Sequence, residues 1–522
     1  MLFVQPFFLF VLLPVAVFVF YLTRHYVGRT AALAVIVAAS AIFYAPYGAL
    51  PATLLATSLC LNLIIGIALS HDGVTSPSLR KILLATGLSL NFAALATFKY
   101  LDQVAALVAP SVEPILGIAI PAGISFYTFH QSVFLLDAYK RQTDVVVFLK
   151  GANNVLGGLA AFIRYAAFVA FFPQLVIGPI TYMSEFAPQA LRQSFGRPRI
   201  TDLQVGTTLI IVGLFKKICI ADTLAIIINP IFGELTVGAP ITSAQALLAI
   251  LGYFFQLYFD FSGYSDIALG IARLFGIRLP INFDSPLRAT GIVDFYRRWH
   301  MTLTRVIVLF IFTPLSLWGM RVAIGRGYKG WRRRALGGWL PFLINFQIIA
   351  LWHSAQYTFV LFGLIHGLWY VVENEVRNSK SFKAYRSRTS DRWRMLAGIA
   401  VTVVPLTLTF ALFRSTSLDA FWNLVLSLVG LGTQPSEPFY INRREWLKIG
   451  VAGAIVYLLP NVYEMLKLYR PGIKTFDNPS ITPYFLRAVW RPNLIWAVFV
   501  SLLAVAVFVN INIPAPFLYA GF

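Results

Sequence analysis

Two histidines in apolar surroundings are the side chains best suited to chemistry. His353 follows a long uncharged stretch and lies in the sequence LWHSAQYTF, while His300 closes the run DFYRRWH. An imidazole takes up and returns a proton near neutral pH, which suits the activation of a hydroxyl group. Each histidine is therefore a candidate catalytic base, although a hydrogen-bonded core histidine is the default for any single one. Arg297 lies one turn before His300 and would share a helix face with it.

The remaining histidines are weaker candidates. His366 follows His353 by 13 positions, which is about 220° around a continuous helix, so the two share a face only if the chain breaks between them. His130, in GISFYTFHQ, fits either a core histidine or the wall of a pocket. His25 and His71 fall in expected loops and are interpreted as surface residues.

Four aspartates lie in or near apolar segments: Asp260, Asp266, Asp284 and Asp294. Asp260 and Asp266 are six residues apart, about 240° around a helix, so they do not form a stacked carboxylate pair. Metal-ligand spacings and an HExxH motif are absent, so no metal site is expected. We expect the aspartates to hold a polar core by pairing with arginines, the candidates being Arg273, Arg278, Arg288 and Arg297.

Several familiar catalytic signatures are missing. The sequence has no GxxxxGK[ST] loop, no GxGxxG loop and no GxSxG elbow. No histidine is followed five positions later by aspartate. Cys60 and Cys219, the only cysteines, lie inside apolar runs, which excludes a disulfide framework and a cysteine zinc site. A histidine-centred transfer reaction or the passive passage of a substrate remains.

The composition indicates the class of protein in which these histidines and aspartates lie. In 522 residues only 12% are charged and 58% are hydrophobic, and the mean hydropathy is +0.74. A soluble protein could not cover so much apolar surface, which indicates an all-α polytopic membrane protein. At about 20 residues per crossing, the apolar runs predict roughly 11 to 13 spans within a single domain, 1–522. Those runs lie near 3–23, 31–49, 51–70, 82–98, 112–136, 154–181, 203–232, 243–259, 304–320, 338–356, 357–374, 396–413, 448–464 and 493–511.

Three of the runs contain helix breakers. These are Pro121/Gly123, Pro173/Gly178/Pro179 and Gly263/Gly270. A broken helix at membrane depth persists only where it lines a cavity or lies against protein. We therefore expect some spans to be broken or re-entrant around a transmembrane cavity.

The charges predict the topology. The first basic residue, Arg24, follows an apolar run that resembles an uncleaved span, so the N-terminus should face outward. The formal net charge of +21 fits an anionic cytoplasmic leaflet better than nucleic acid, for which no binding motif is present. Segments 321–334 and 377–394 are strongly basic, either as cytoplasmic anchors or as a platform for a phosphate-bearing donor. A hairpin over 338–374 would then turn near Ser354–Gln356, away from the cytoplasmic rim.

At these residues the chain resembles the membrane-bound O-acyltransferase (MBOAT) family, and in particular its bacterial alginate O-acetylation branch. The run QLYFDFSGYSDIALGIARLFGIRLPINFDSPLRATGIVDFYRRWHMTLTR (256–305) and the block LWHSAQYTFVLFGLIHG (351–367) carry the resemblance. It departs from the branch where Ser354-Ala355-Gln356-Tyr357 replaces the usual residues after the tryptophan and histidine, and over 306–319. Further matching stretches are FLFVLLP, IFYAPYG, PAGISFYTF, FFPQLVIGPI, GLFKKICIAD and the ending PFLYAGF.

The resemblance implies a helical membrane fold around a cavity that joins a cytoplasmic donor to an extracytoplasmic acceptor. It places the catalytic core in 256–374, with His353 catalytic and His300 supporting it. The donor implied is acetyl-CoA, used as a substrate rather than kept as a bound cofactor. Arg297, Arg298, Asn282 and Asp294 are then candidates for donor binding.

The function expected is O-acetylation of an extracellular polysaccharide such as alginate, from a bacterial inner membrane. A periplasmic or single-span acetyltransferase partner would complete it, with membrane lipids as the other partners. Two alternatives stay open: D-alanyl-type transfer to a cell-envelope polymer, and a polysaccharide or lipid transporter that would depend on the intramembrane aspartates. A DNA-associated membrane anchor is the least favoured hypothesis.

Overall fold

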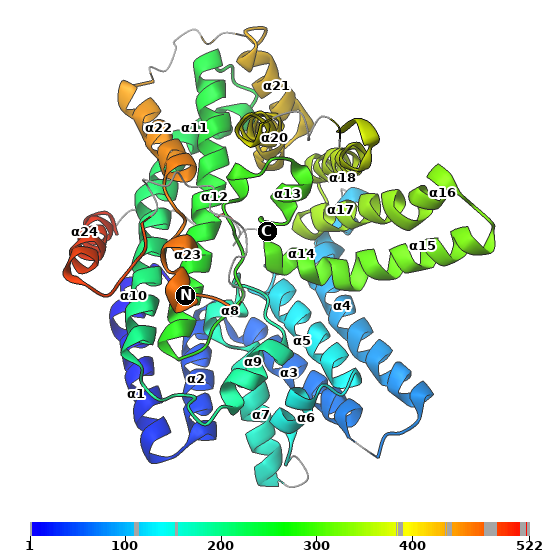
Figure 1. Ribbon diagram of the computed structural model, residues 1–522, viewed down its shortest axis with the longest axis vertical. Helices are drawn as coiled ribbons and strands as arrows, with labels where there is room; N and C mark the ends of the chain where they lie inside the picture. The colour runs from blue at the N-terminus through cyan, green and yellow to red at the C-terminus, as the bar shows by residue number, and fades with distance from the viewer. Residues whose placement is uncertain are drawn as a thin grey trace.

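In the computed structural model, the described residues are 3–71, 73–108, 114–151, 155–382, 384, 390–433, 435, 441–473, 488–511 and 518. Within these ranges every regular element is helical (Figure 1). Nine of the described helical segments are long and apolar enough to cross a membrane. They are Phe8–Tyr26, Arg29–Tyr47, Ala49–Ser70, Pro77–Ala105, Ser243–Leu274, Met301–Gly325, Gly330–His353, Tyr357–Asn378 and Trp393–Arg414.

Nine is fewer than the 11 to 13 spans predicted, because some apolar runs fold as shorter pieces. Three apolar helices of the described chain, Val155–Val169, Leu418–Leu428 and Leu494–Asn510, have 10 to 17 residues. The run near 154–181, for example, divides at its Pro and Gly residues. The polytopic helical fold is confirmed, with interrupted segments as expected.

Residues 3–191 form the lower part of the molecule in Figure 1. Long apolar runs form long helices here, and their ends coincide with Gly28, Gly48 and the loop at His71. The elements are η1 (Phe8–Leu12), α1 (Leu13–Tyr26), α2 (Arg29–Tyr44), η2 (Ala45–Tyr47), α3 (Ala49–Ser70), α4 (Pro77–Val108), α5 (Ile124–Tyr139), α6 (Thr143–Leu149), α7 (Val155–Val169), α8 (Phe172–Leu175) and α9 (Met183–Leu191).

Two of the predicted helix breaks are confirmed, and they lie against each other. Gly123, with φ of 73°, precedes α5, and the chain after α8 bends through Gly178. A Cβ at Gly123 would collide with the carbonyl oxygen of Leu175, and one at Gly178 with that of Pro173. Glycine is therefore required at both turns, since the backbones approach too closely for any side chain.

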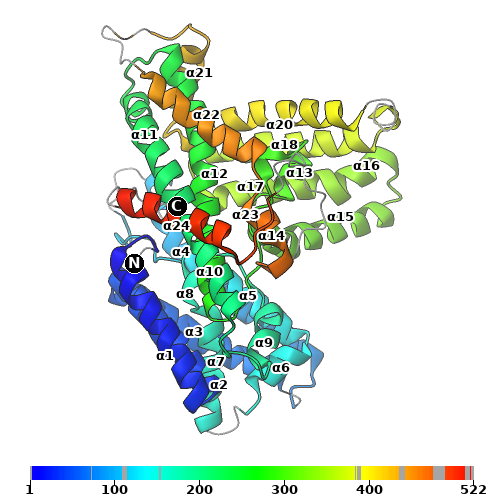
Figure 2. The same ribbon diagram turned by 60° about the vertical axis from the view of Figure 1, so that its left-hand side comes forward.

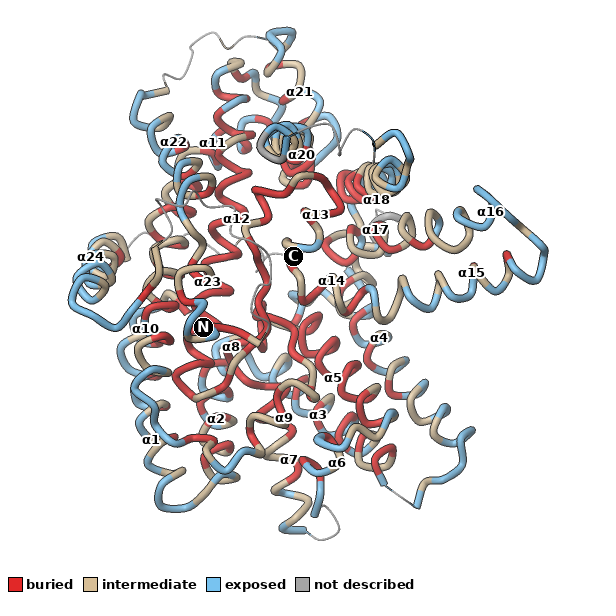
Figure 3. Tube along the Cα trace, viewed as in Figure 1, coloured by how far each residue is buried: buried red, intermediate tan, exposed pale blue. Residues whose placement is uncertain are grey.

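The third predicted break is wrong. α12 (Ser243–Leu274) is one uninterrupted helix of 32 residues and is almost wholly buried, as Figure 3 shows. Gly263 and Gly270 face α10 (Ile200–Leu214), where a Cβ at Gly270 would lie 2.6 Å from the carbonyl oxygen of Gly206. Glycines in a membrane helix serve close packing of helix on helix as readily as they serve a break.

Several of the remaining helices pack along α12. Its N-terminal end lies beside α11 and α21, α20 and α22 also contact it, and α15 and α16 project away from it (Figures 1 and 2). The elements are η3 (Phe215–Asp222), α11 (Thr223–Thr236), η4 (Pro286–Arg288), α13 (Ile292–Tyr296), α14 (Met301–Ile307), η5 (Val308–Phe312), α15 (Thr313–Gly325), α16 (Gly330–Arg334), η6 (Ala335–Trp339), α17 (Leu340–His353), α18 (Tyr357–Asn378), α20 (Asp391–Arg414), α21 (Leu418–Leu428), α22 (Arg443–Leu458), α23 (Val462–Met465), η7 (Lys467–Tyr469) and α24 (Leu494–Asn510).

The predicted hairpin over 338–374 is confirmed. α17 ends at His353 and α18 begins at Tyr357, so the turn falls at Ser354–Gln356. Gly363 and Gly367 let the two helices approach, because a Cβ at Gly363 would lie 2.7 Å from the Cβ of Ala350. The hairpin therefore presents His353 at its turn, which is where α4 meets it.

Candidate functional site

His353 lines a cavity of about 300 Å³ between the first and second halves of the chain. One wall comes from the two confirmed helix breaks, through residues such as Pro121, Gly123 and Val176. The opposite wall comes from Trp352 and His353 at the end of α17, together with Lys99 of α4. The broken segments thus line a cavity, as predicted, and the cavity contains an imidazole that can exchange protons.

His300 lies close to this wall without lining it. Its buried ring packs edge-on against Phe261 of α12, with centroids 4.7 Å apart, and lies 6.4 Å from the ring of Trp352. Trp352 in turn is 4.6 Å from the ring of His353. The fold therefore brings the two predicted histidines, 53 positions apart in the sequence, next to one indole ring.

A polar clamp holds His300 in an unusual backbone conformation. His300 has φ of 43° and stands directly before α14. The buried side-chain oxygen of Asn282 accepts a hydrogen bond of 2.6 Å from the Thr302 hydroxyl. The backbone carbonyl oxygen of Asn282 accepts one of 3.0 Å from the backbone amide of Met301. A non-glycine residue at positive φ costs free energy that its surroundings must offset, and these hydrogen bonds hold the backbone next to His300 in place.

The predicted shared helix face of Arg297 and His300 is wrong, because α13 ends at Tyr296 and α14 begins only at Met301. Arg297 is exposed. Arg298 is mostly buried, where its Nε lies 2.8 Å from Asp294 and its Nη1 lies 3.7 Å from Asp284. Of the four donor-binding candidates, the structure thus places Asn282, Arg298 and Asp294 in the scaffold beneath His300.

Asp260 and Asp266 pair with lysines, whereas the other two aspartates pair with Arg298, which is not one of the four predicted arginines. Lys217 bridges Asp260 at 2.6 Å and Asp222 at 2.7 Å, while Lys216 binds Asp266 at 2.6 Å. The glycine contacts between α10 and α12 explain the difference, since they bring η3 and its lysines directly onto the helix that carries the carboxylates.

His366 and His130 are held within the core. The Tyr296 hydroxyl and His366 Nδ1 are 2.7 Å apart, and the His366 ring stacks on Phe362 at 4.0 Å. The chain does break between His353 and His366, yet Phe362 and Phe413 lie between their rings. His130 is fully buried against Phe168, which favours the core interpretation.

The first basic segment, 321–334, forms the projecting tip of α15 and α16 (Figures 1 and 2). Arg332 lies over the rings of Tyr328 and Trp331, and Arg334 binds Glu375 of α18 at 3.2 Å. Part of the second segment, 377–394, lies outside the described residues; within the described part, Arg377 binds Glu373 at 2.6 Å.

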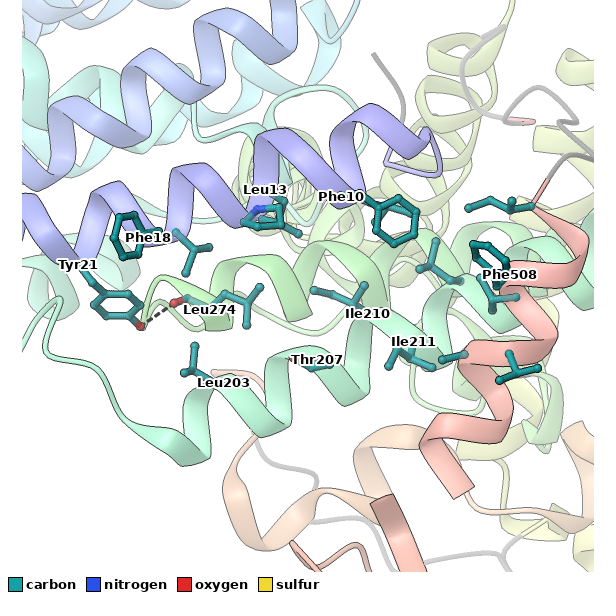
Figure 4. A pocket seen from close by; sticks show the side chains of 18 residues that line it. Phe10, Leu13, Phe18, Tyr21, Leu203, Thr207, Ile210, Ile211, Leu274 and Phe508 are labelled. Carbon is teal, nitrogen blue, oxygen red and sulfur yellow. Dashed lines mark hydrogen bonds between the residues drawn. The ribbon is translucent and has the colours of Figure 1, made fainter. Parts of the chain in front are cut away.

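A larger hollow of about 850 Å³ lies between α1, α10 and α24 and is shown in Figure 4. Its lining is almost entirely aliphatic and aromatic, and the Tyr21 hydroxyl on it donates to the Leu274 carbonyl oxygen at 2.6 Å. A hollow without a titratable group other than this tyrosine offers no acid–base chemistry. No group of three or more His, Cys, Asp or Glu in the described chain could hold a metal ion.

Sequence reasoning missed Lys99. It occurs at the end of an apolar run, in the sequence ATFKY, which resembles an ordinary helix terminus. The signal that could have identified it is the length of α4, because the helix continues past Lys99 and the lysine therefore lies inside it.

Comparisons with known proteins find one family and several similar sequences. The sequence model of the MBOAT, membrane-bound O-acyltransferase family matches residues 37–401. The chain is 32% identical to the peptidoglycan O-acetyltransferase of Helicobacter pylori over 447 residues, covering 83% of this chain and 80% of the relative. It is 28% identical to the probable alginate O-acetylase AlgI of Azotobacter vinelandii over the whole of both chains. A teichoic acid D-alanyltransferase of Streptococcus thermophilus is 25% identical, over 58% of this chain and 69% of the relative.

Proposed function

Since this chain belongs to the membrane-bound O-acyltransferase family and is a multi-pass membrane acyltransferase, we propose that it transfers acetyl groups from cytoplasmic acetyl-CoA for O-acetylation of an extracytoplasmic polysaccharide. The observation that carries this proposal is the position of His353, at a helix end, in a cavity formed by two broken helices. The names of relatives from two species support a cell-envelope or secreted glycan as the acceptor class.

In this proposal His353 is the general base. It removes the proton from the acceptor hydroxyl as that oxygen attacks the acyl carbonyl carbon, and returns the proton to the departing thiolate. His300 supports the reaction through Trp352, whose indole ring lies next to both histidines. Asn282 and Arg298 act one step further away, by fixing the backbone on either side of His300.

We place the donor on the cytoplasmic side of a bacterial inner membrane, with the N-terminus on the opposite side. The arginines at the tip of α15 and α16 carry a positive charge that suits the phosphates of coenzyme A. The acceptor is reached directly or through a periplasmic or single-span acetyltransferase partner. The ion pairs of Asp260 and Asp266 favour transfer over transport, because lysines already neutralise both carboxylates.

The test is the amount of ester-bound acetyl on envelope polysaccharide in cells that express wild type or His353→Ala at equal membrane levels. We expect the acetyl content to fall by at least about 100-fold, the usual contribution of a general base. His71→Ala changes an exposed histidine and serves as the control. If His353→Ala cells carried as much ester-bound acetyl as wild type, the proposal would be overturned. If His353→Ala lost ester-bound D-alanine instead of acetyl, the transferred group would be D-alanyl and not acetyl.

A further inference from the structure

Lys99 is a buried cation on the wall of the His353 cavity. Its side chain belongs to α4 and is 4% exposed. Its Nζ donates a hydrogen bond to the carbonyl oxygen of Trp352 and lies 5.0 Å from the centroid of the Trp352 ring. Lys99 and His353 thus meet at the same point of the cavity although they are 254 positions apart in the sequence.

Lys99 has no carboxylate partner among the described residues, in contrast to Lys216 and Lys217. Lys216 and Lys217 each bind aspartate at 2.6 Å. Among the described residues no carboxylate lies within 4.0 Å of Lys99 Nζ. A charge that is buried in a membrane without a counter-charge is costly, and such residues face cavities where a ligand completes them.

We propose that Lys99 stabilises the negative charge that develops on the acyl carbonyl oxygen during transfer. This inference rests on the proposed function, and it adds a catalytic residue that would contact the donor itself. An ammonium group has three N–H donors. One is directed at Trp352, and the others can reach a carbonyl oxygen held in the cavity that His353 also lines.

In this step the acceptor oxygen forms a bond to the acyl carbon while His353 takes its proton, and the carbonyl electron pair moves to the oxygen that faces Lys99. When that pair returns, the carbon–sulfur bond breaks, and the thiolate takes the proton back from His353. The products are an O-ester and a free thiol, and both His353 and Lys99 regain their starting states.

The position of the charge suits this role. At the tetrahedral intermediate the oxyanion would lie between the ammonium of Lys99 and the newly formed imidazolium of His353, so both cations attract it. A fixed cation in a site of low dielectric, already in place before the reaction, stabilises developing charge more effectively than water does.

A purely structural role for Lys99 makes a different prediction. The carbonyl groups at the end of a helix need donors, and Lys99 caps α17 in this way. Tyr100, its neighbour, does the same, because its hydroxyl donates to the Leu351 carbonyl oxygen at 3.0 Å, but it does not line the cavity. Tyr100→Phe is therefore the matched control for loss of a cap without loss of charge.

The experiment uses membrane vesicles from cells that make the full chain with its native partners, and acetyl-CoA as the probe. Release of free thiol and ester-bound acetyl give kcat and KM for wild type, Lys99→Met, Lys99→Gln, Lys99→Arg and Tyr100→Phe. Lys99→Gln removes the charge and keeps an amide N–H donor, on a side chain one bond shorter. We expect kcat to fall by about 10²- to 10³-fold in Lys99→Met and Lys99→Gln, with KM within about threefold.

Lys99→Arg should recover at least about tenfold of the lost kcat, because it restores the cation, while Tyr100→Phe should stay within about threefold of wild type. Equal effects in Lys99→Gln and Tyr100→Phe would overturn the inference in favour of capping. A raised KM with unchanged kcat would overturn it in favour of ground-state donor binding. His353→Ala separates the two proposals: if it loses transfer and Lys99→Gln does not, only this inference fails, and if neither loses transfer, the proposed function fails as well.

Discussion

Two regions of this protein keep charged groups inside the membrane, and they do so in opposite ways. Between η3 and α12, the buried side chain of Lys217 is bound to both Asp260 and Asp222. At the turn of α17 and α18, Lys99 and His353 face a cavity of about 300 Å³ instead. The first arrangement is closed by its own partners, and the second is open to a ligand.

Charged groups of the first kind contribute to stability, and groups of the second kind are available for chemistry. A charge that has a partner at 2.6 Å has already spent its interaction energy within the fold, so it holds helices together. A cation that lines a cavity, as Lys99 does, can also interact with whatever enters that volume. Burial of a titratable residue therefore does not identify a catalytic site until its partners are known.

The strongest test of the contrast compares two buried histidines. His353→Gln should lower transfer by about 10²- to 10⁴-fold, because the base is lost. His366→Gln, which changes a core residue that does not line the cavity, should lower transfer by less than about threefold per folded molecule. Ester-bound acetyl normalised to the protein in the membrane provides the measurement. Comparable losses in both variants would remove the distinction between cavity and core.

The paired region should respond in stability rather than in rate. Asp260→Ala removes one of the two carboxylates that bind the buried ammonium of Lys217, so we expect the free energy of unfolding to fall by about 1.5–3 kcal/mol. Thermal denaturation of the purified protein measures the loss, and the transfer rate of the molecules that remain folded should be unchanged. The reverse result, full stability with lost function, would favour the transporter interpretation.

The glycine contact that creates this pairing can be tested separately. A Cβ at Gly213 would lie 2.6 Å from the carbonyl oxygen of Gly263, so Gly213→Ala should destabilise the protein by about 1–3 kcal/mol through overpacking. Gly233→Ala, on the next helix, meets no atom within 4 Å and should be neutral or slightly stabilising. The same midpoint for both variants in thermal denaturation would contradict the close approach of α10 and α12.

The smallest effect is expected at the two adjacent arginines. Arg297 is exposed, so Arg297→Ala should change stability by less than about 0.5 kcal/mol. Arg298→Ala breaks the ion pair with Asp294 beneath His300 and should lower transfer and stability modestly, by about 1 kcal/mol in stability. Paired denaturation and acetylation measurements check this order, and a larger loss from Arg297→Ala would return that side chain to the site.

Local sequence determined much of this molecule. Apolar length and the absence of charge predict membrane helices, and Pro121, Gly123 and Gly178 predict the broken segments that line the cavity. The turn at Ser354–Gln356 could also be predicted, since it lies between two apolar runs. The candidates His353 and His300 stood out because a titratable ring is unusual in such surroundings. All these signals depend on neighbours along the chain.

The tertiary structure alone decided which faces meet. The sequence does not distinguish a glycine that breaks a helix from one that allows close packing against a neighbouring helix. The break predicted at Gly263 and Gly270 is therefore wrong. The partners of Asp260 and Asp266 followed from that contact and could not be found by counting residues. Lys99 joined His353 only because α4 lies against the end of α17. Periodicity and composition are local properties, whereas the partner of a buried charge is set by packing between segments that are distant in the sequence.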